Sequence, residues 1–366
     1  MKKPIMGIIG WGGKHGRGRY GQWLRKVLSQ LDYDVIGSDI GTELTNKEVV
    51  QRADIVIFSV PTRRTPSIIR KVLPYVREAQ LLMDVTSVKT HAVVAMLESR
   101  AEVVGLHPEC APPPSYSWRG QNVVVCEARL TDRWRPWVSE FLQSTEATVK
   151  FSDPDTHDRY MGPVQVLPHD INVALAATFR RSGLNMAEML SFATPPFRLG
   201  CCGMGRTLKQ DPHLLIDIQV CNPHTPAMLR RFELEFGRVR RIVERMIKTG
   251  DRRRYLREFR KSQEFFGENL LAHTFESFDN LIGLMVDLMG SSVVLVQVKE
   301  DRPGVLHEIL TPFSDAGINL IALHSRKVGA KGFRFLINLD RDRTSPEVVA
   351  TLKKIEAIPS VEIVKN

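Results

Sequence analysis

Two short stretches of the chain combine buried strands with side chains that can move a proton. Apolar strands run into Asp84-Val-Thr-Ser-Val-Lys89 and into Gly105-Leu-His-Pro108. Ligands of an open parallel sheet bind at the carboxyl ends of its strands, so neighbouring strands would bring Ser87 and His107 to one edge. A histidine is readily poised to take a proton near neutral pH, and a partner hydroxyl can fix its tautomer. The alternative is that Ser87 caps the next helix and His107 is a hydrogen-bonded loop histidine.

The N-terminal residues are typical of a strand, a turn and a helix that hold a dinucleotide. An apolar strand over residues 4–10 leads into Gly10-Trp-Gly-Gly-Lys-His-Gly16 and then a helix over about 20–31. Glycines let the backbone approach a pyrophosphate, and the free N–H groups of the helix start attract it. Asp39, after the next strand, can bind ribose hydroxyls and would repel a 2′-phosphate, which favours NAD over NADP. A plain tight turn is the alternative.

Strands and helices alternate up to residue 150. A further buried strand over residues 53–58 ends at a Ser-Val-Pro turn that would lie along the cofactor, and the last strand is expected over 122–127. This alternation predicts an α/β domain over 1–150 with a doubly wound, mostly parallel, Rossmann-like sheet. The expected cofactor contacts are Gly10, Gly12, Gly13, Gly16, Asp39, Ser59, Val60 and Pro61.

From about residue 151 the pattern becomes helical. Apolar residues recur with helical spacing over 157–182, 184–193, 212–221, 225–248 and 251–284. This predicts an all-helical domain over 151–288 that closes the cleft and forms a dimer. Its candidate substrate-binding groups are His157 (next to Asp158), His169 and Arg206, since arginine suits bidentate carboxylate binding. The alternatives are a surface histidine, a core histidine and a solvated arginine.

The last segment, residues 291–366, has a different order of elements. Strands are expected over 293–299, 319–328, 332–340 and 359–365, with helices over 303–316 and 345–356. This βαββαβ order predicts a ferredoxin-like sandwich of a sheet and two helices.

Composition narrows the classes of function. The chain has 366 residues, a formal net charge of +10 and five cysteines with no CxxC pair, so neither a disulfide framework nor a zinc site is expected. No apolar run reaches the roughly 20 residues that span a bilayer, and no signal peptide is evident, so we expect a cytoplasmic protein without a membrane partner. The basic run 238–260 alternates with apolar residues at helical spacing and has no DNA-reading motif. We therefore expect no nucleic-acid partner.

Over nearly its whole length the chain resembles the prephenate dehydrogenase family, including its arogenate-using members, with a C-terminal ACT regulatory domain. The stretches that carry this resemblance are Asp84-Val-Thr-Ser-Val-Lys89, Gly105-Leu-His-Pro108, His157-Asp158, Leu167-Pro168-His169, Arg206-Thr-Leu-Lys-Gln-Asp-Pro212, Asp301-Arg-Pro-Gly-Val-Leu306, Gly317-Ile-Asn-Leu320 and His324-Ser-Arg326.

The resemblance implies NAD-dependent oxidative decarboxylation of prephenate to 4-hydroxyphenylpyruvate, a step of tyrosine biosynthesis, by a homodimer. It implies that His107 is the catalytic histidine and Ser87 its hydrogen-bonding partner. His169 would contact the substrate side chain, and Arg206 would hold the ring carboxylate. The ACT motifs imply feedback by tyrosine or phenylalanine, bound at Asp301, Gly304, Val305, Leu306, Asn319 and Leu320.

The chain departs from the family pattern at three places. Trp11 stands where the phosphate loop usually has its second glycine, and Val166 replaces a histidine in Gln165-Val-Leu-Pro-His169. The segment after His107-Pro108 lacks its usual glycine-containing loop. Arogenate and 4-amino-4-deoxyprephenate therefore stay open as substrates. A protein of another class, a non-catalytic sensor of NAD and an amino acid, is a further alternative. A β-hydroxyacid dehydrogenase is a third, although no catalytic lysine stands out in the helical part.

Overall fold

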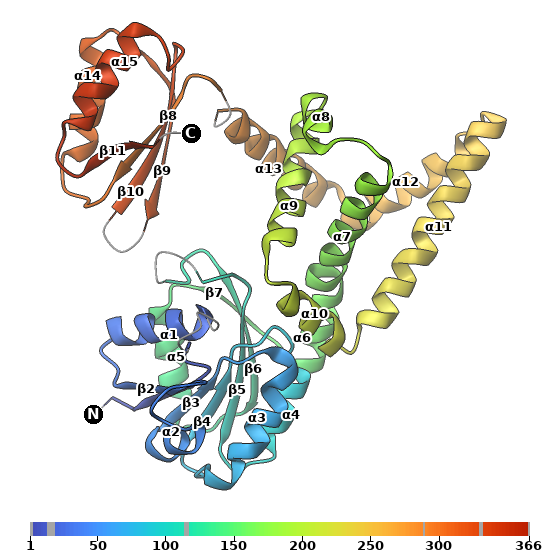
Figure 1. Cartoon of the computed structure of the whole chain (residues 1–366). Coiled ribbons are helices and arrows are strands. Elements are labelled where there is room, and N and C mark those ends of the chain that lie inside the picture. Colours follow the sequence, from blue (N-terminus) through green and yellow to red (C-terminus); the bar gives the residue numbers. More distant parts are fainter. Residues whose placement is uncertain (1–2, 13–18, 113–116, 288–289, 329–331, 365–366) are drawn as a thin grey trace. The chain divides into compact units, whose positions relative to one another are not determined.

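The structure is a computed structural model of the chain, and it describes residues 3–12, 19–112, 117–287, 290–328 and 332–364 (Figure 1). The chain divides into two compact units. The first contains residues 1–178 and 206–232, and the second contains residues 179–205 and 233–366. Helices α7, α9 and α11 each contribute residues to both units.

A seven-stranded sheet is the centre of the first unit. Its strands are β1 (Met6–Ile9), β2 (Val35–Ser38), β3 (Ile55–Phe58), β4 (Leu81–Asp84), β5 (Glu102–Pro108), β6 (Asn122–Arg129) and β7 (Thr148–Phe151). Their order is β2-β1-β3-β4-β5-β6-β7, and every neighbouring pair is parallel except β5 with β6. The predicted Rossmann-like, mostly parallel sheet is confirmed. The prediction missed β7, a short and largely exposed edge strand.

Helices cover both faces of this sheet (Figure 1). They are α1 (Arg19–Gln30), α2 (Asn46–Arg52), α3 (Thr65–Val72), α4 (Thr90–Leu97) and α5 (Arg135–Ser144). Successive side chains of a strand point to opposite faces, so Ile55 and Ile57 pack with α1 and α5, while Val56 and Phe58 pack with α2, α3 and α4. Burial of both faces explains why these strands read as continuous apolar runs.

The first unit also holds helical segments that follow the sheet. These are α6 (Pro154–Met161), a π-helical turn (Gly162–Val166), α7 (Leu167–Arg181) and α10 (Pro212–Cys221). The single helix predicted over 157–182 is therefore interrupted. Pro163 lies in the π turn, and proline lacks the N–H that an α-helical hydrogen bond needs there.

The second unit contains a helical part. Its elements are α8 (Met186–Ser191) and α12 (Arg253–Phe266), α13 (Glu268–Asp287), and most of α9 (Pro195–Lys209) and α11 (Thr225–Thr249). Two predictions differ here. The single helix expected over 251–284 breaks at Gly267, whose φ of 75° is left-handed. Helix α9 was not predicted, and its three glycines disfavour helix in isolation.

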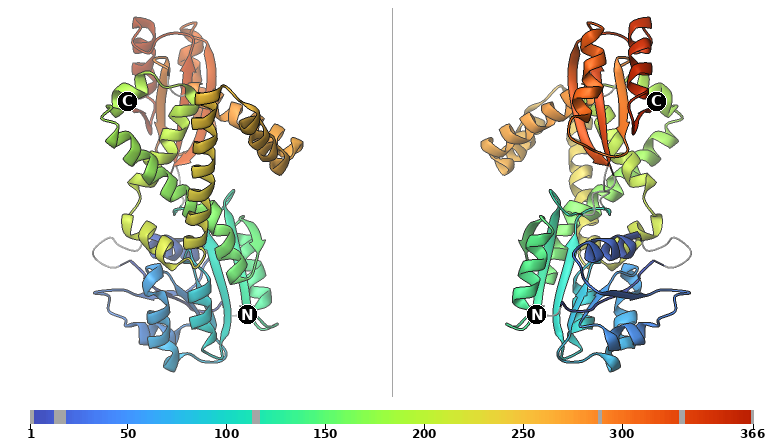
Figure 2. Two further views of the ribbon diagram at one scale, coloured as in Figure 1. Left: turned by 90° about the vertical axis from the view of Figure 1, so that its right-hand side faces the viewer. Right: turned by 90° about the vertical axis from the view of Figure 1, so that its left-hand side faces the viewer.

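The C-terminal part of the second unit is a four-stranded sheet with two helices. Its elements are β8 (Val293–Val298), α14 (Val305–Asp315), β9 (Leu320–Val328), β10 (Gly332–Leu339), α15 (Pro346–Glu356) and β11 (Val361–Val364). The strands are antiparallel in the order β11-β8-β10-β9, and both helices lie on one face (Figure 2). The predicted ferredoxin-like βαββαβ fold is confirmed.

Candidate active site

His107 lies near the end of β5, where the strand leaves the sheet core. The strand is buried along its whole length, and only 3% of His107 is exposed. In the parallel pairing of β4 with β5, Asp84 is opposite Gly105, two residues before His107. The fold therefore brings the two stretches singled out in the sequence to one edge of the sheet.

The Asp84–Lys89 stretch forms a buried network of hydrogen bonds beneath that edge. The Lys89 ammonium donates to Asp84 Oδ2 at 2.5 Å and to the Leu106 carbonyl at 2.6 Å, and both charged side chains are fully buried. The Thr86 hydroxyl also donates to Asp84 Oδ2. A Cβ on Gly105 would lie 2.9 Å from Val93 Cγ2 and 3.3 Å from Lys89 Cδ. This network holds the loop after β4 against β5 and fixes the strand that carries His107.

A chain of hydrogen bonds connects His107 to a carboxylate on α6. His107 Nδ1 lies 2.9 Å from His157 Nε2, and His157 Nδ1 lies 2.8 Å from Asp158 Oδ1. The His157 and Asp158 side chains are fully buried. Both ring nitrogens of His157 therefore have partners inside the protein, whereas the sequence had suggested a substrate contact.

The predicted pairing of Ser87 with His107 also needs correction. His157 occupies Nδ1 of the His107 ring, and no hydrogen bond joins Ser87 to His107 among the described residues. Ser87 is half-buried in the loop between β4 and α4. Sequence reasoning missed the pair of histidines because 50 residues separate them. The signal that could have found it is the His157-Asp158 dipeptide at the start of a helix.

Asp158 is anchored at the N-terminus of α4. Its Oδ1 accepts the Lys89 N–H at 2.8 Å and its Oδ2 accepts the Thr90 N–H at 2.9 Å. Burial raises the pKa of Asp158, but hydrogen bonds from His157, Lys89 and Thr90 outweigh burial and leave that pKa below its usual value. The carboxylate is therefore ionised near neutral pH, where the positive end of the helix dipole also favours it.

The same surroundings disfavour a positive charge on His107. Burial holds the pKa of His107 well below its usual value, and the nearby His157 and Lys89 lower it further, while Asp158 opposes them in part. A neutral imidazole near pH 7 has one nitrogen free to accept a proton. His107 is accordingly suited to act as a proton acceptor.

The nucleotide end of the site lies where the strand order reverses, between β1 and β3. Gly10 has φ 93°, and a Cβ there would lie 2.2 Å from the Ser59 carbonyl. Gly12 has φ 92°, and its N–H donates to Asp39 Oδ2 at 2.8 Å. Ser59 and Val60 are half-buried after β3, and Pro61 beside them is exposed. These features fit a backbone that a dinucleotide approaches closely.

Two further predicted contacts, Gly13 and Gly16, lie outside the described residues.

The packing of Trp11 explains why a tryptophan fits where the phosphate loop of the family usually has a glycine. A Cβ on Gly37 would lie 1.9 Å from Trp11 Cε3, so the indole lies against a residue that has no side chain. The Arg25 guanidinium stacks over the same indole, 4.7 Å from the ring centroid.

His169 and Arg206 form a second polar group of the first unit. His169 is half-buried on α7, and burial followed by the charge of Arg206 on α9 lowers its pKa. Its Nδ1 is buried without a hydrogen-bond partner among the described residues. The Asn172 amide donates to Thr207 Oγ1 at 2.9 Å and connects the two helices. The structure thus brings the two predicted substrate groups together.

The predicted effector residues lie in the C-terminal sheet domain. Asp301 and Gly304 are in the turn between β8 and α14, and Asn319 precedes Leu320 at the start of β9. Leu306 is half-buried, but Val305 is 3% exposed because its side chain packs in the core. A ligand could therefore reach Val305 through its backbone alone.

Three family models match consecutive parts of the chain. Residues 35–151 match "Prephenate dehydrogenase, nucleotide-binding domain", residues 153–261 match "Prephenate dehydrogenase, dimerization domain", and residues 292–357 match "ACT domain". A "Probable arogenate/prephenate dehydrogenase" of Methanocaldococcus jannaschii is 30% identical over 84% of this chain and 72% of that protein.

The chain belongs to the prephenate dehydrogenase family. A "T-protein" of Enterobacter agglomerans is 29% identical over 75% of this chain and 70% of its own length. The fold is shared with a solved prephenate dehydrogenase of A. aeolicus in complex with hydroxyphenyl propionate and NAD+ (TM-score 0.55, 21% identity, 73% of this chain, 99% of that chain). A Synechocystis arogenate dehydrogenase shares it as well (TM-score 0.53, 16% identity, 72% of this chain, 100% of that chain).

Membership of this family makes the chain a dehydrogenase of the prephenate/arogenate class with a nucleotide-binding domain and an ACT domain. Within the described part of the chain, no group of three or more His, Cys, Asp or Glu side chains could hold a metal ion. In that same part, no helix combines the length and the apolar character needed to cross a membrane.

Proposed function

We propose that this dehydrogenase oxidises prephenate with NAD and releases carbon dioxide and 4-hydroxyphenylpyruvate. The observation that carries the proposal is a neutral, buried His107 at the carboxyl edge of the sheet, held through Nδ1 by His157. Its Nε2 accepts the proton of the hydroxyl on ring carbon C4. Bound NAD supplies the acceptor for the hydride that leaves that carbon. The ring becomes aromatic when carbon dioxide departs, so the protein mainly has to orient the groups.

Arg206 and His169 bind the substrate's two anionic ends. The Arg206 guanidinium holds the ring carboxylate until it leaves, and His169 contacts the pyruvyl side chain. Nδ1 of His169 has no protein partner among the described residues, so it can bond to a ligand. We propose that Ser87 contacts the reacting hydroxyl or the nicotinamide amide.

The cofactor-binding residues favour NAD. Gly10 and Gly12 keep side chains away from the pyrophosphate path, and the Ser59-Val60-Pro61 turn lies beside them at the end of β3. Asp39 would receive the ribose hydroxyls and repel a 2′-phosphate. A comparison of NAD and NADP as oxidants tests this, because a preference for NADP would contradict the role of Asp39.

Arogenate is the second candidate substrate, and one observation favours it. Gln165 Oε1 and Gln219 Oε1 are buried acceptors without a partner among the described residues. The Gln219 amide is oriented by its own N–H, which donates to the Val166 carbonyl at 3.0 Å. Two carbonyl acceptors near the His169 stretch suit an ammonium group, which arogenate has where prephenate has a ketone.

The deciding experiment compares NADH formation with prephenate, arogenate and 4-amino-4-deoxyprephenate. The proposal expects the highest kcat/KM with prephenate. A higher value with arogenate would replace the substrate but keep the chemistry, and the amino analogue distinguishes oxidation at a carbon that bears nitrogen. No NADH with any of the three would overturn the proposal and favour a sensor that binds NAD and an amino acid.

The ACT domain supports feedback by tyrosine or phenylalanine. We expect one of these amino acids to bind near the turn at Asp301 and Gly304 and to change kcat or KM. Titration of each amino acid, followed by activity and by melting temperature, measures the effect. If neither quantity changes with either amino acid, regulation through this domain is contradicted.

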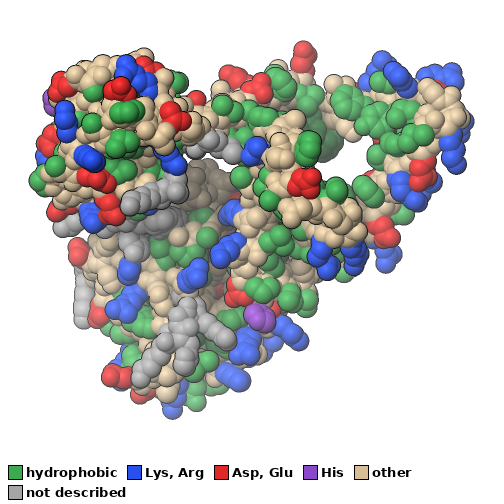
Figure 3. Space-filling model, turned by 45° about the horizontal axis from the view of Figure 1, so that its top comes forward, with side chains coloured by type: hydrophobic (Ala, Val, Ile, Leu, Met, Phe, Trp, Pro, Cys, Tyr) green, Lys and Arg blue, Asp and Glu red, His purple; other side chains and the backbone are tan. Residues whose placement is uncertain are grey.

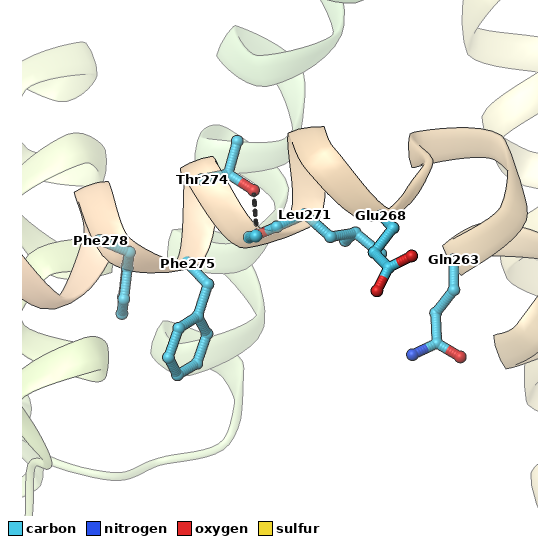
Figure 4. Close-up of a pocket in the computed structure, with 7 residues that line it drawn as sticks. Gln263, Glu268, Leu271, Thr274, Phe275 and Phe278 are labelled. Atoms are coloured by element: carbon cyan, nitrogen blue, oxygen red, sulfur yellow. Dashed lines mark hydrogen bonds between the residues drawn. The ribbon is translucent and has the colours of Figure 1, made fainter.

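Exposed apolar side chains on the helices of the second unit support a homodimer (Figure 3). A groove on α12 and α13 is lined by Gln263, Glu268, Leu271, Ala272, Thr274, Phe275 and Phe278. Phe275, 68% exposed, and Phe278 project from the same side of α13 (Figure 4). Large exposed apolar patches mark interaction surfaces, and a second copy of this chain is the proposed partner. Sedimentation of the Phe275→Asp variant tests this, since an unchanged mass would count against this face as the interface.

A further inference from the structure

The hydrogen bonds behind His107 have a defined direction. The ionised Asp158 can only accept, so the His157 ring must donate to it through Nδ1–H. A neutral His157 then has a lone pair on Nε2, which accepts the Nδ1–H of His107 across 2.9 Å. His107 therefore presents the lone pair of its Nε2 away from His157. The Asp158 carboxylate thus fixes the tautomers of both His157 and His107.

A positive charge is unequally tolerated along this chain of groups. On His107 it is disfavoured by burial and by the nearby Lys89 ammonium. On His157 it would lie 2.8 Å from the Asp158 carboxylate. Opposite charges at that distance in a buried site attract strongly, so the proton is better accommodated one residue further from the substrate.

We propose that His157 and Asp158 are positioning residues that act through His107, by fixing its tautomer and by receiving the proton that it takes from the substrate. This inference rests on the proposed function, because it needs a substrate hydroxyl that loses a proton. It goes beyond the family assignment, which gives His157 no task, and it replaces the substrate contact expected from the sequence.

The proton transfers balance as follows. The substrate O–H bond breaks, its electron pair forms the C4 carbonyl as hydride leaves C4, and the proton joins His107 Nε2. The His107 Nδ1–H bond breaks, and that proton joins His157 Nε2, which leaves His107 neutral and His157 positive beside Asp158. When the ring carboxylate leaves as carbon dioxide, the ring electrons return to the oxygen as a phenolate. The two transfers then reverse and give the phenol, so no net proton is released.

Several groups around the three residues set the pH range of this relay. Lys89, in the loop after β4, and Asp84, at the end of β4, form a buried ion pair. Mainly because of burial, the pKa of Cys126 on β6 is about 12, so its thiol stays neutral. The Asn222 amide donates to the Asp158 carbonyl at 2.8 Å and adds no charge. We therefore expect kcat to fall as the pH drops through the lowered pKa of His107.

The test compares two substitutions of His157. In His157→Gln the amide carbonyl can accept the His107 Nδ1–H, but it cannot take the proton; in His157→Leu neither is possible. We expect kcat of the Gln variant to fall by roughly 10²-fold and that of the Leu variant by more, with KM nearly unchanged. The wild-type solvent isotope effect should indicate two protons in flight, and the Gln variant only one. A Gln variant within about twofold of wild-type kcat would overturn the relay.

A matched control is a second histidine, His224, which contacts the same helix. His224 Nε2 lies 3.1 Å from Asp155 of α6, but this histidine–aspartate pair is partly exposed and does not touch His107. His224→Gln should leave kcat and its pH profile unchanged. An equal loss in both Gln variants would mean that the effect is general destabilisation, and the relay would be rejected.

A second measurement does not depend on turnover. In protein labelled with ¹⁵N-histidine, the ring nitrogen shifts report which nitrogen carries the proton, and His107→Asn identifies the His107 signals. We expect the Nδ1–H form of His107 in the wild type and in His157→Gln, and a mixture in His157→Leu. An Nε2–H form in the wild type would overturn the inference. The tautomers can be confirmed even if no tested cyclohexadienol is oxidised, so failure of the proposed function is distinguishable.

Discussion

Two polar regions of the first unit are built in opposite ways. Around His107, in what we call the bonded region, most polar side-chain atoms are buried and bonded to one another, from the Asp84–Lys89 pair to the contact of His157 with Asp158, although Asp84 Oδ1 is buried without a partner among the described residues. The region around His169 and Arg206, which we call the open region, has polar groups that are not bonded within the described part of the protein. His169 Nδ1 and two glutamine carbonyls are buried without partners among the described residues, and Arg206 is exposed.

We infer from this difference that the bonded region carries out the chemistry and that the open region binds the substrate. A buried network in which most polar atoms are bonded is rigid and defines protonation states before any ligand arrives. A buried polar atom without a partner costs free energy, and such atoms persist mainly where function requires them. We therefore expect substitutions in the bonded region to change kcat or folding. Substitutions in the open region should change the binding of substrate.

The largest expected effect is that of His107→Asn. The amide cannot take the proton of the substrate hydroxyl, so kcat should fall by at least about 10³-fold. The affinity for NAD, measured by calorimetry, should stay near that of the wild type, since His107 is not among the predicted nucleotide contacts. Near-normal turnover would show that His107 takes no part in the chemistry, and the assignment of the chemistry to the bonded region would fail.

Lys89→Met tests the bonded region through stability. The substitution leaves Asp84 charged and buried without its partner, which should cost about 3–5 kcal/mol of the free energy of unfolding. Chemical denaturation measures this cost, and the double variant Lys89→Met with Asp84→Leu should recover much of it. The exposed pair of Arg70 with Glu98 is the matched control, and Arg70→Met should change stability little. Equal losses at both pairs would contradict the role of burial.

Arg206→Ala tests the open region. Loss of hydrogen bonds to the ring carboxylate should raise KM by roughly 10- to 100-fold with a smaller change in kcat and no loss of stability. Arg206→Lys keeps the charge without the planar fork and should have an intermediate KM. A variant that lowers kcat while KM stays unchanged would place Arg206 with the chemistry instead of recognition.

The smallest expected effect is the pH dependence of stability. The pKa of His107 is below its usual value in the folded protein, so the unfolded chain binds its proton first as the pH falls. The stability due to neutral His107 is therefore complete above pH 6.5 and is lost as the pH falls toward the folded-state pKa. Denaturation of wild type and His107→Asn between about pH 5 and 8 measures the difference. Parallel curves for the two proteins would show that His107 is not held neutral.

The sequence by itself determined much of this protein. Strand periodicity and glycine placement predicted the Rossmann-like sheet and the βαββαβ domain, because burial of apolar faces and turn conformations are local in the chain. The same reasoning placed Ser87 and His107 at one edge of the sheet. It failed at Gly267 and in α9, where a glycine ends one helix and three glycines are tolerated in another.

Only the tertiary structure decided what His157 does. Its neighbours in the chain do not reveal that β5 and α6 pack so that Nε2 of His157 meets Nδ1 of His107. The sequence suggested that His157 contacts the substrate, and it did not reveal a partner for Lys89. In the structure the side chains of His157 and Lys89 are both buried and hydrogen-bonded within the protein. Hydrogen bonds between residues far apart in the chain depend on the packing of whole elements. Such bonds determine which nitrogen of His107 is free, and local sequence patterns carry no information about them.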